Sequence, residues 1–303
     1  MAARTASRLG RWLVSGPPML YLIVFFAAPS LIMVLASFRT PGEFGGLAPL
    51  IEEGKLDVNL DSYVRFFSES VYAQIFLKSF WYALLTTLFC LTIAYPLASL
   101  IARSSKRYRD LLLLLVILPF WSNFLIRVYA WMIILGPNAA LARTVNAMLG
   151  WFGHEPVPLL FSAFAVLTCL VYVHLPFMVL PLYANLEKHD QALLDAAQDL
   201  GANGWQRFWR ITFPLSLPGV YAGAALVFIP AFGIFAIPDI LGGPEDSMIG
   251  NVIKQQFLET RDWPFGSVLS IVLTVVALVL AGLAAWVARR NLGTPSSARE
   301  SRA

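Results

Sequence analysis

Charged residues are scarce in this chain of 303 residues, because lysine, arginine, aspartate and glutamate together make up only 13% of it. An ordinary soluble domain has about 25% charged and about 45–50% apolar residues. In this chain 58% of the residues are hydrophobic, and the net charge is only +4. This composition argues against a soluble enzyme, a disordered protein and a nucleic-acid binder.

Cysteine, histidine and nucleotide-binding motifs are also sparse. The two cysteines, Cys90 and Cys169, both lie in apolar runs, which excludes a disulfide framework and a cysteine-based metal site. The three histidines stand in separate segments without a His-Glu-x-x-His pattern, and the sequence contains no Gly-x-x-x-x-Gly-Lys-Ser/Thr motif. We therefore expect no metal site, no catalytic residues and no cofactor bound by this chain, ATP included.

Long apolar runs are the dominant feature of the sequence. A helix needs roughly 20 apolar residues to cross a bilayer. Six runs meet this length, and none alternates as a β-strand would: Pro17–Phe38, Leu77–Ala102, Leu111–Leu135, Leu159–Ala184, Phe213–Leu241 and Gly266–Ala288. The sequence predicts an all-α polytopic membrane protein with six transmembrane helices.

These runs also predict the domain organisation. The first run is longer than the 7–15-residue core of a signal peptide, so we expect a retained helix. The outer loop that follows should hold a short helix near residues 62–67. The predicted order is a cytoplasmic N-terminus 1–16, a first helix 17–38, an extracytoplasmic loop 39–76, a five-helix core 77–288 and a disordered cytoplasmic tail 289–303.

The placement of lysine and arginine predicts the orientation of the chain in its membrane. With six spans both termini share one side, and that side carries fourteen basic residues against six acidic ones. The loops on the other side carry six basic residues against eleven acidic ones. Because positive charge accumulates on the cytoplasmic side, both termini should be cytoplasmic. The acidic outer loops would attract a cationic ligand or a basic docking surface.

The segment between the fourth and fifth runs carries the most informative pattern. Apolar residues recur at helical spacing up to Leu200, where Gly201 should end a short helix. Gly204 then opens a second short helix with Trp205, Phe208 and Trp209 on one face. The pattern predicts a compact helix-turn-helix on the cytoplasmic face. A pair of amphipathic helices lying on the membrane is the alternative.

This segment resembles the EAA loop of the binding-protein-dependent (MetI-like) ABC-importer permeases. The family pattern is Glu-Ala-Ala, three residues, Gly, nine residues and Ile-x-Leu-Pro. Here Asp195 replaces the glutamate and Phe213 the leucine, and both keep the chemical character. The resemblance implies a type I importer permease fold and a loop, residues 187–214, that seats on a cytoplasmic ATPase. The implied coupling residues are Asp195, Ala196, Ala197, Gly201, Ala202, Ile211 and Pro214.

Three further stretches are similar to the spermidine/putrescine-type permeases. The first two are Leu118–Trp131 and Leu175–Tyr183, and the third region comprises Leu241–Pro244, Met248–Ile253 and Arg261–Pro264. The resemblance implies a permease for polyamines in a bacterial plasma (inner) membrane that pairs with a second, related permease. It also implies two copies of an ATPase that binds ATP and Mg, and an extracytoplasmic substrate-binding protein. Permeation of another small solute, such as an opine, an aminophosphonate or thiamine, is the alternative.

Two charges inside the predicted spans are candidate functional groups. Arg127 is expected to act as a gate, or as a structural charge that pairs between helices or extends to the outer surface. Asp239 follows Pro230 and Pro238, which should bend the fifth span. Its carboxylate would contact an ammonium group of the substrate, cap a turn or pair with Arg127.

Aromatic residues near the third span are candidates for the substrate path, because cation–π contacts suit alkylammonium ligands. They are Trp121, Tyr129 and Trp131, with Trp263 further along the chain. The same residue types also gather at membrane interfaces.

Two other classes of protein stay open at this point. A membrane-embedded enzyme would need paired titratable groups, for which Arg127, Asp239 and His174 are the candidates. A non-transporting scaffold or sensor needs none.

Overall fold

The computed structural model describes residues 15–49, 51–52, 55–56 and 58–292. The predictions for residues 1–14 and for the tail from residue 293 lie outside the described residues. Within them, six helical stretches are long and apolar enough to cross a membrane: Ser15–Ala36, Ser70–Arg103, Phe124–Trp151, Ala163–Leu186, Gly204–Gly233 and Trp263–Trp286. The third stretch consists of two consecutive helices. The predicted all-α fold with six long apolar helices is confirmed.

The chain divides into two compact units. Residues 1–72 and 252–274 form the first, and residues 73–251 and 275–303 form the second. Three helices have residues in both units: α4 (Ser70–Arg103), α13 (Ile249–Leu258) and α14 (Trp263–Leu292).

The first unit contains the first apolar helix and the loop that follows it. The helix includes a π-helical turn, η1 (Ile23–Ala27), followed by α2 (Ala28–Ala36). The strands β1 (Ile51–Glu52) and β2 (Lys55–Leu56) pair antiparallel, and α3 (Asp61–Ser68) confirms the predicted short helix. Arg65 of α3 donates hydrogen bonds to Glu69, Asp262 and Tyr72. One side chain thereby connects α3 to the start of α14.

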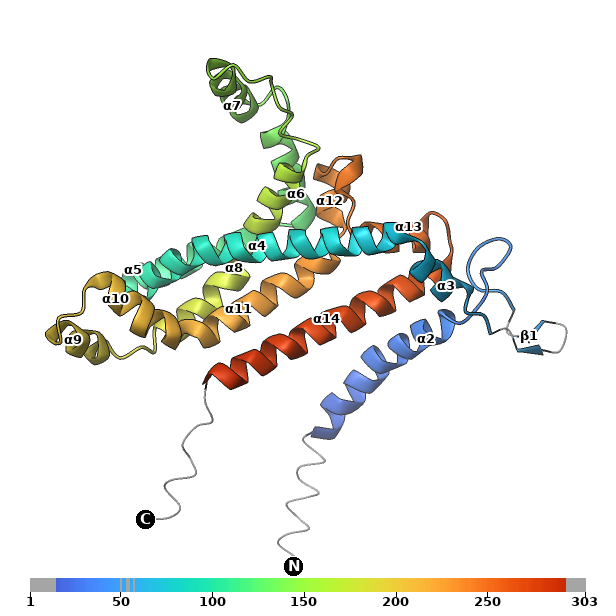
Figure 1. Cartoon of the computed structure of the whole chain (residues 1–303), viewed down its shortest axis with the longest axis horizontal. Coiled ribbons are helices and arrows are strands. Elements are labelled where there is room, and N and C mark those ends of the chain that lie inside the picture. Colours follow the sequence, from blue (N-terminus) through green and yellow to red (C-terminus); the bar gives the residue numbers. More distant parts are fainter. Residues whose placement is uncertain (1–14, 50, 53–54, 57, 293–303) are drawn as a thin grey trace, which may run out of the picture. The chain divides into compact units, whose positions relative to one another are not determined.

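The second unit is organised around α4, α8 (Ala163–Leu186) and α11 (Phe213–Gly233), which run side by side (Figure 1). Helix α11 packs along α8 with glycine at two positions four residues apart. A Cβ atom at Gly219 would lie 2.8 Å from Cβ of Asn185 and 3.0 Å from the carbonyl oxygen of Pro181. At Gly223 it would lie 2.6 Å from Sδ of Met178. The two glycines therefore allow the close approach that small residues provide between membrane helices.

The third predicted span is not continuous, which corrects the prediction for Leu111–Leu135. Helix α5 (Lys106–Ile117) is followed by the short 3₁₀ helix η2 (Leu118–Trp121), and α6 (Phe124–Leu135) begins anew. Proline at 119 has no N–H to continue the α-helical bonding. Asn123 then caps α6, because its side chain accepts a hydrogen bond from the Leu125 N–H. After Gly136 the chain continues into α7 (Ala140–Trp151).

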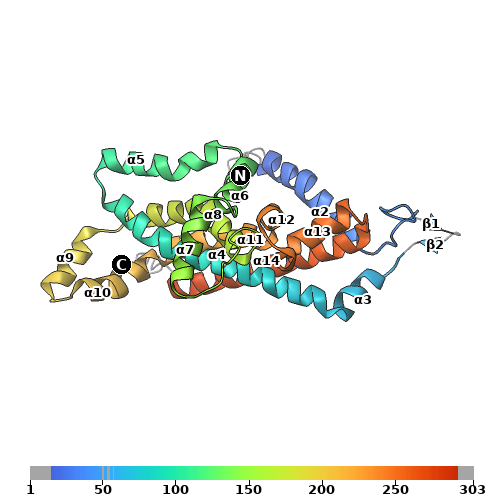
Figure 2. The ribbon, with the colours of Figure 1, turned by 90° about the horizontal axis from the view of Figure 1, so that it is seen from above.

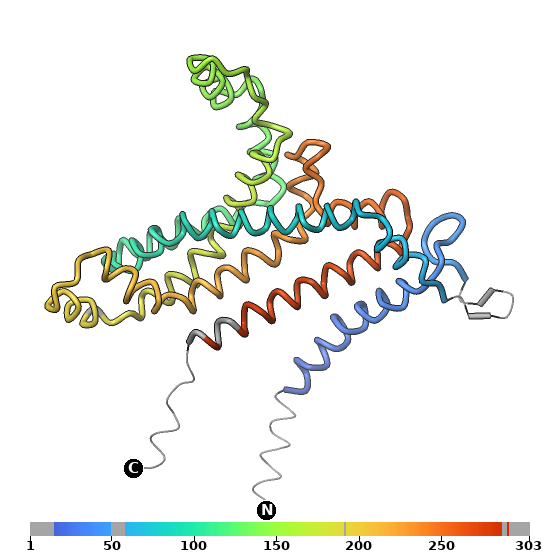
Figure 3. Tube along the Cα trace, viewed as in Figure 1, coloured from blue at the N-terminus to red at the C-terminus, as the bar shows by residue number. Residues whose placement is uncertain are grey.

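The fifth predicted span is also interrupted. Helix α11 ends at Gly233, Ile234 is extended, and a separate helix α12 (Ala236–Leu241) follows (Figure 3). Ile237 and Leu241 of α12 pack in a buried cluster with Val128 and Leu135 of α6. A 3₁₀ turn, η4 (Pro244–Asp246), connects α12 to α13. The run Phe213–Leu241 is therefore two helices, of which the second, α12, packs against α6.

Candidate functional site

The segment between α8 and α11 folds as the predicted helix-turn-helix. Helix α9 (Gln191–Asp199) is capped by Asp190, whose side chain accepts a hydrogen bond from the Ala192 N–H. Gly201 has φ = +82°, a left-handed conformation that glycine adopts without strain. Asn203 and Gln206 form a reciprocal capping box at the start of α10 (Gly204–Arg207). Each local turn is thus encoded by the residue types that occupy it.

Side-chain contacts attach this loop to the spanning helices. The Phe208 ring, in the π-helical turn η3 (Phe208–Thr212), packs edge-on against Tyr95 of α4 with centroids 5.3 Å apart. The Tyr95 hydroxyl lies 2.9 Å from the Ser216 hydroxyl of α11. Arg207 donates to the Gln198 side chain at 2.7 Å, which joins α10 to α9. The loop lies at the same end of the second unit as the C-terminus of α4 (Figure 2).

The outer surface of the loop is uncovered in the described chain. Leu200 is 89% exposed and Trp205 71% exposed, and a Cβ atom at Gly201 would meet nothing within 4 Å. These two apolar side chains therefore have little packing against the rest of the described chain. Of the predicted coupling residues, Asp195, Ala196, Gly201 and Pro214 are exposed, and Ala197, Ala202 and Ile211 are half-buried.

Arg127 is bonded within its own segment rather than to Asp239. Its guanidinium donates to the carbonyl oxygen of Pro119 and, at 3.1 Å, to that of Ser122. It also lies over the Phe120 ring, 5.4 Å from the centroid. The Pro119 oxygen also accepts hydrogen bonds from the Ser122 N–H at 3.3 Å and from the Ser122 hydroxyl at 2.8 Å. Arg127 therefore adds a charged donor to carbonyl groups at the break between η2 and α6.

Replacing Arg127 with methionine should lower the stability of the protein by about 1–3 kcal/mol, because the carbonyl oxygens of Pro119 and Ser122 each lose a charged donor. Thermal unfolding of the purified transporter would measure this change. Arg143→Met is the matched control, since Arg143 is exposed on α7. Equal thermal midpoints for the two variants would contradict the structural role of Arg127.

Asp239 is positioned by an asparagine that follows it by twelve residues. Asn251 Nδ2 donates to Asp239 Oδ1 at 2.5 Å and to the carbonyl oxygen of Phe235 at 3.0 Å. Its Oδ1 accepts a hydrogen bond from the Met248 N–H at 2.9 Å. Asn251 thus connects the break between α11 and α12 to the start of α13 and holds one oxygen of an exposed carboxylate.

The predicted aromatic residues lie in different environments. Trp121 is 76% exposed at the end of η2, and Tyr129 is exposed on α6. Trp131 packs against Tyr172 of α8, with centroids 5.5 Å apart, beside the buried cluster. Trp263 begins α14 and is counted in the first unit. Trp131 therefore has a packing partner within the second unit, whereas Trp121 and Tyr129 present exposed rings.

Sequence reasoning did not identify the side chains that hold the α12–α13 connection. The Tyr82 hydroxyl donates to Asp246 Oδ1 at 2.6 Å, and the other Asp246 oxygen accepts from the Gly243 N–H. The Ile249 N–H donates to the Ser79 hydroxyl at 2.7 Å. Tyr82 and Asp246 lie 164 positions apart and Ser79 and Ile249 lie 170 apart, so no local pattern indicates these two pairs. The Gly219–Gly223 spacing, by contrast, could have been read as a helix-packing motif.

Comparison with known proteins supports the family. Residues 94–292 match the family described as binding-protein-dependent transport system inner membrane component. The chain is 43% identical over 274 residues to the spermidine/putrescine transport system permease protein PotB of Escherichia coli (strain K12), covering 90% of this chain and 95% of that protein. It is 28% identical over 288 residues to the inner membrane ABC transporter permease protein YdcU of the same strain, covering 89% and 87%.

Solved structures share the fold. A bacterial ABC transporter involved in the import of the acidic polysaccharide alginate aligns with a TM-score of 0.73 at 22% identity, over 95% of this chain and 99% of that chain. The same kind of transporter in complex with an alginate-bound periplasmic protein aligns with a TM-score of 0.71 at 20% identity, over 94% and 96%. Together with the six apolar helices, these matches describe a multi-pass membrane protein with the ABC-importer permease fold. The chain belongs to the family of inner membrane components of binding-protein-dependent transport systems, and it is a transport subunit rather than an enzyme.

Proposed function

We propose that this chain is the permease subunit of an ATP-driven importer of polyamines such as spermidine and putrescine. The observation that carries the proposal is the 43% identity to spermidine/putrescine permeases over 90% of the chain. Such identity extends through the spans and the connections between them. The chain would form half of a translocation path that opens to one side of the membrane at a time.

The partner assignment is supported by the exposed loop α9–α10. We propose that it seats on a cytoplasmic ATPase, which binds ATP and Mg, while this chain binds no cofactor. Helix continues from Gly204 to Gly233, so a displacement of α10 would move α11. Helix α11 in turn packs closely on α8 through Gly219 and Gly223. This rigid connection is suited to transmit closure of two ATPase copies to the path.

The remaining partners follow from the two-sided architecture. A second, related permease would complete the path, and an extracytoplasmic binding protein would deliver the solute to the outer loops. The distribution of basic residues supports cytoplasmic termini and a cytoplasmic α9–α10 loop. The same orientation puts the acidic loops outside, where they would favour the approach of a cationic solute.

The test of this function is uptake by the complete transporter, reconstituted with its ATPase, second permease and binding protein. Labelled spermidine and putrescine should enter the vesicles only with ATP and binding protein. Absence of polyamine uptake in a complex that hydrolyses ATP would reject the substrate and retain the permease assignment. Opines, aminophosphonates and thiamine would then be the solutes to screen.

Asp239→Asn should reduce polyamine uptake about ten-fold, because a charged ammonium–carboxylate contact contributes about 1.5–3 kcal/mol and each 1.4 kcal/mol is a factor of ten. The measurement is the concentration dependence of uptake. Glu245→Gln is the matched control, since Glu245 is an exposed carboxylate in the neighbouring η4 turn. Unchanged uptake in Asp239→Asn, or an equal loss in both variants, would remove Asp239 from the path.

A further inference from the structure

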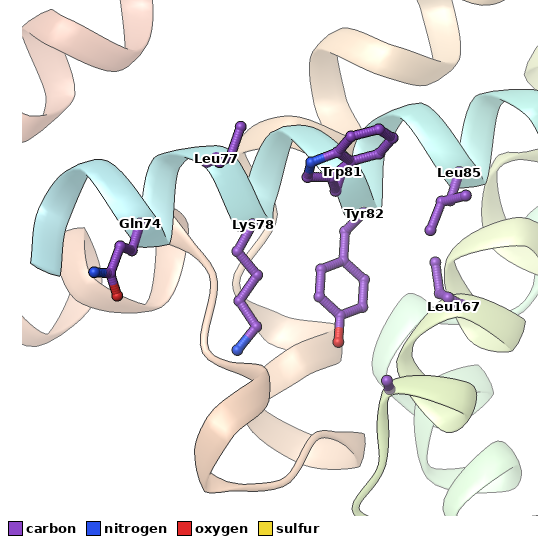
Figure 4. Close-up of a pocket in the computed structure, with 8 residues that line it drawn as sticks. Gln74, Leu77, Lys78, Trp81, Tyr82, Leu85 and Leu167 are labelled. Carbon is purple, nitrogen blue, oxygen red and sulfur yellow. The ribbon is translucent and has the colours of Figure 1, made fainter.

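An open apolar groove lies between α4 and α8 in the second unit (Figure 4). Its volume is about 440 Å³, within the range of ligand pockets. Leu85 of α4 faces Leu167 of α8 in this view. The apolar lining comprises Leu77, Trp81, Leu85, Ala163 and Leu167. Leu77 is 59% exposed and Trp81 52% exposed, so the α4 wall is uncovered in the described chain.

One cation lines this groove. Lys78 and Tyr82 extend from the same side of α4 (Figure 4). The Tyr82 hydroxyl is bonded to Asp246, whose two carboxylate oxygens accept from Tyr82 and Gly243. Lys78 makes no hydrogen bond or ion pair with another side chain among the residues that the structure describes. A lysine in a spanning helix needs an anion or water, because hydrocarbon solvates its ammonium group poorly.

The position of Lys78 along α4 matches the boundary of the hydrocarbon core. Helix α4 has 34 residues, which is about 51 Å at 1.5 Å per residue. Lys78 lies eight to nine positions from the middle of this helix, or about 13 Å along its axis. Half of a typical hydrocarbon core is about 15 Å. A helix centred in the bilayer therefore brings the Lys78 ammonium group to the level of lipid headgroups.

We infer that this groove binds one anionic phospholipid, with an acyl chain against Trp81, Leu85 and Leu167 and the headgroup phosphate on Lys78. Charge complementarity selects this occupant, because an apolar slot with a single cation at headgroup depth matches an anionic lipid. A cationic solute would be repelled by Lys78. The inference depends on membrane insertion and not on the identity of the transported solute.

Quenching of Trp81 fluorescence by brominated lipids tests this site. The complete transporter is placed in membranes of equal parts phosphatidylglycerol and phosphatidylcholine, with bromine on the acyl chains of only one lipid at a time. The difference between the wild type and Trp81→Phe isolates the Trp81 signal. Phosphatidylglycerol should quench about five-fold more effectively, the ratio expected for one basic residue at about 1 kcal/mol. Lys78→Gln should bring the two lipids to equal quenching.

Lys78→Arg should retain the preference, and Lys188→Gln, which removes an exposed cation from the loop after α8, should not alter it. Equal quenching by the two lipids in the wild type would overturn the proposal. An unchanged preference in Lys78→Gln would also overturn it. Loss of the second permease from purified Lys78→Gln, with lipid preference unchanged, would identify the groove as a protein interface instead.

Discussion

Replacing Gly201 with tryptophan is expected to reduce ATP-dependent uptake about ten-fold or more, while the amount of the chain in the membrane stays unchanged. Gly201 has φ = +82°, and a non-glycine residue in that conformation costs about 1–3 kcal/mol. Each 1.4 kcal/mol is a factor of ten in the population of the loop conformation that the structure shows. A Cβ atom at Gly201 would meet no atom within 4 Å and Gly201 is exposed, so we expect the new side chain to project from the surface of the loop.

Gly201→Asn is the matched control, because asparagine tolerates the left-handed conformation better than other residues and is far smaller than tryptophan. It should retain most of the uptake. The measurements are uptake, membrane content of the chain, and stimulation of ATP hydrolysis by the solute-loaded binding protein. In Gly201→Trp, hydrolysis should no longer respond to the binding protein. Normal uptake in this variant would remove the loop from the coupling path, and loss of the chain from the membrane would indicate a folding role.

Replacing Gly219 with leucine is expected to lower the thermal midpoint of the purified transporter by roughly 2–12 °C. The new Cβ atom would lie 2.8 Å from Cβ of Asn185 and 3.0 Å from the Pro181 carbonyl oxygen, which belongs to the backbone of α8. Overpacking of this kind costs about 1–3 kcal/mol, and each kcal/mol corresponds to about 2–4 °C in a protein of this size. Uptake should fall as well, because α8 and α11 would separate.

The same helix provides a graded series. Gly223→Leu should have a smaller effect, because the nearest atom is Sδ of Met178, at the end of a flexible side chain. Ala222→Leu is the control, since Ala222 is exposed on α11 between the two glycines. Its thermal midpoint should stay close to that of the wild type. An equal decrease for Ala222→Leu and Gly219→Leu would show that close packing at Gly219 does not determine stability.

The apolar helices and the α9–α10 loop were predictable because their signals are local. Run length and hydropathy identify a spanning helix, since backbone groups in lipid must bond within their own segment. The loop was equally readable, because Asp190, Gly201 and Asn203 act on neighbours within three residues of themselves. The interruptions of the third and fifth spans were not predicted. Proline lies near both, but proline inside α8 at positions 176 and 181 does not end that helix.

By itself, the sequence determined that this chain has six apolar helices with few charges within them, and a helix-turn-helix loop with an EAA-like spacing. Only the tertiary structure decided how the polar groups in and beside these helices are used. Arg127 donates hydrogen bonds to carbonyl groups at a helix break, and Asn251 donates one to Asp239. Tyr82 donates one to Asp246, which lies 164 positions further along the chain. The physical reason is that apolar burial depends on composition along a segment, whereas a hydrogen bond depends on which two groups the packed helices bring within 3 Å.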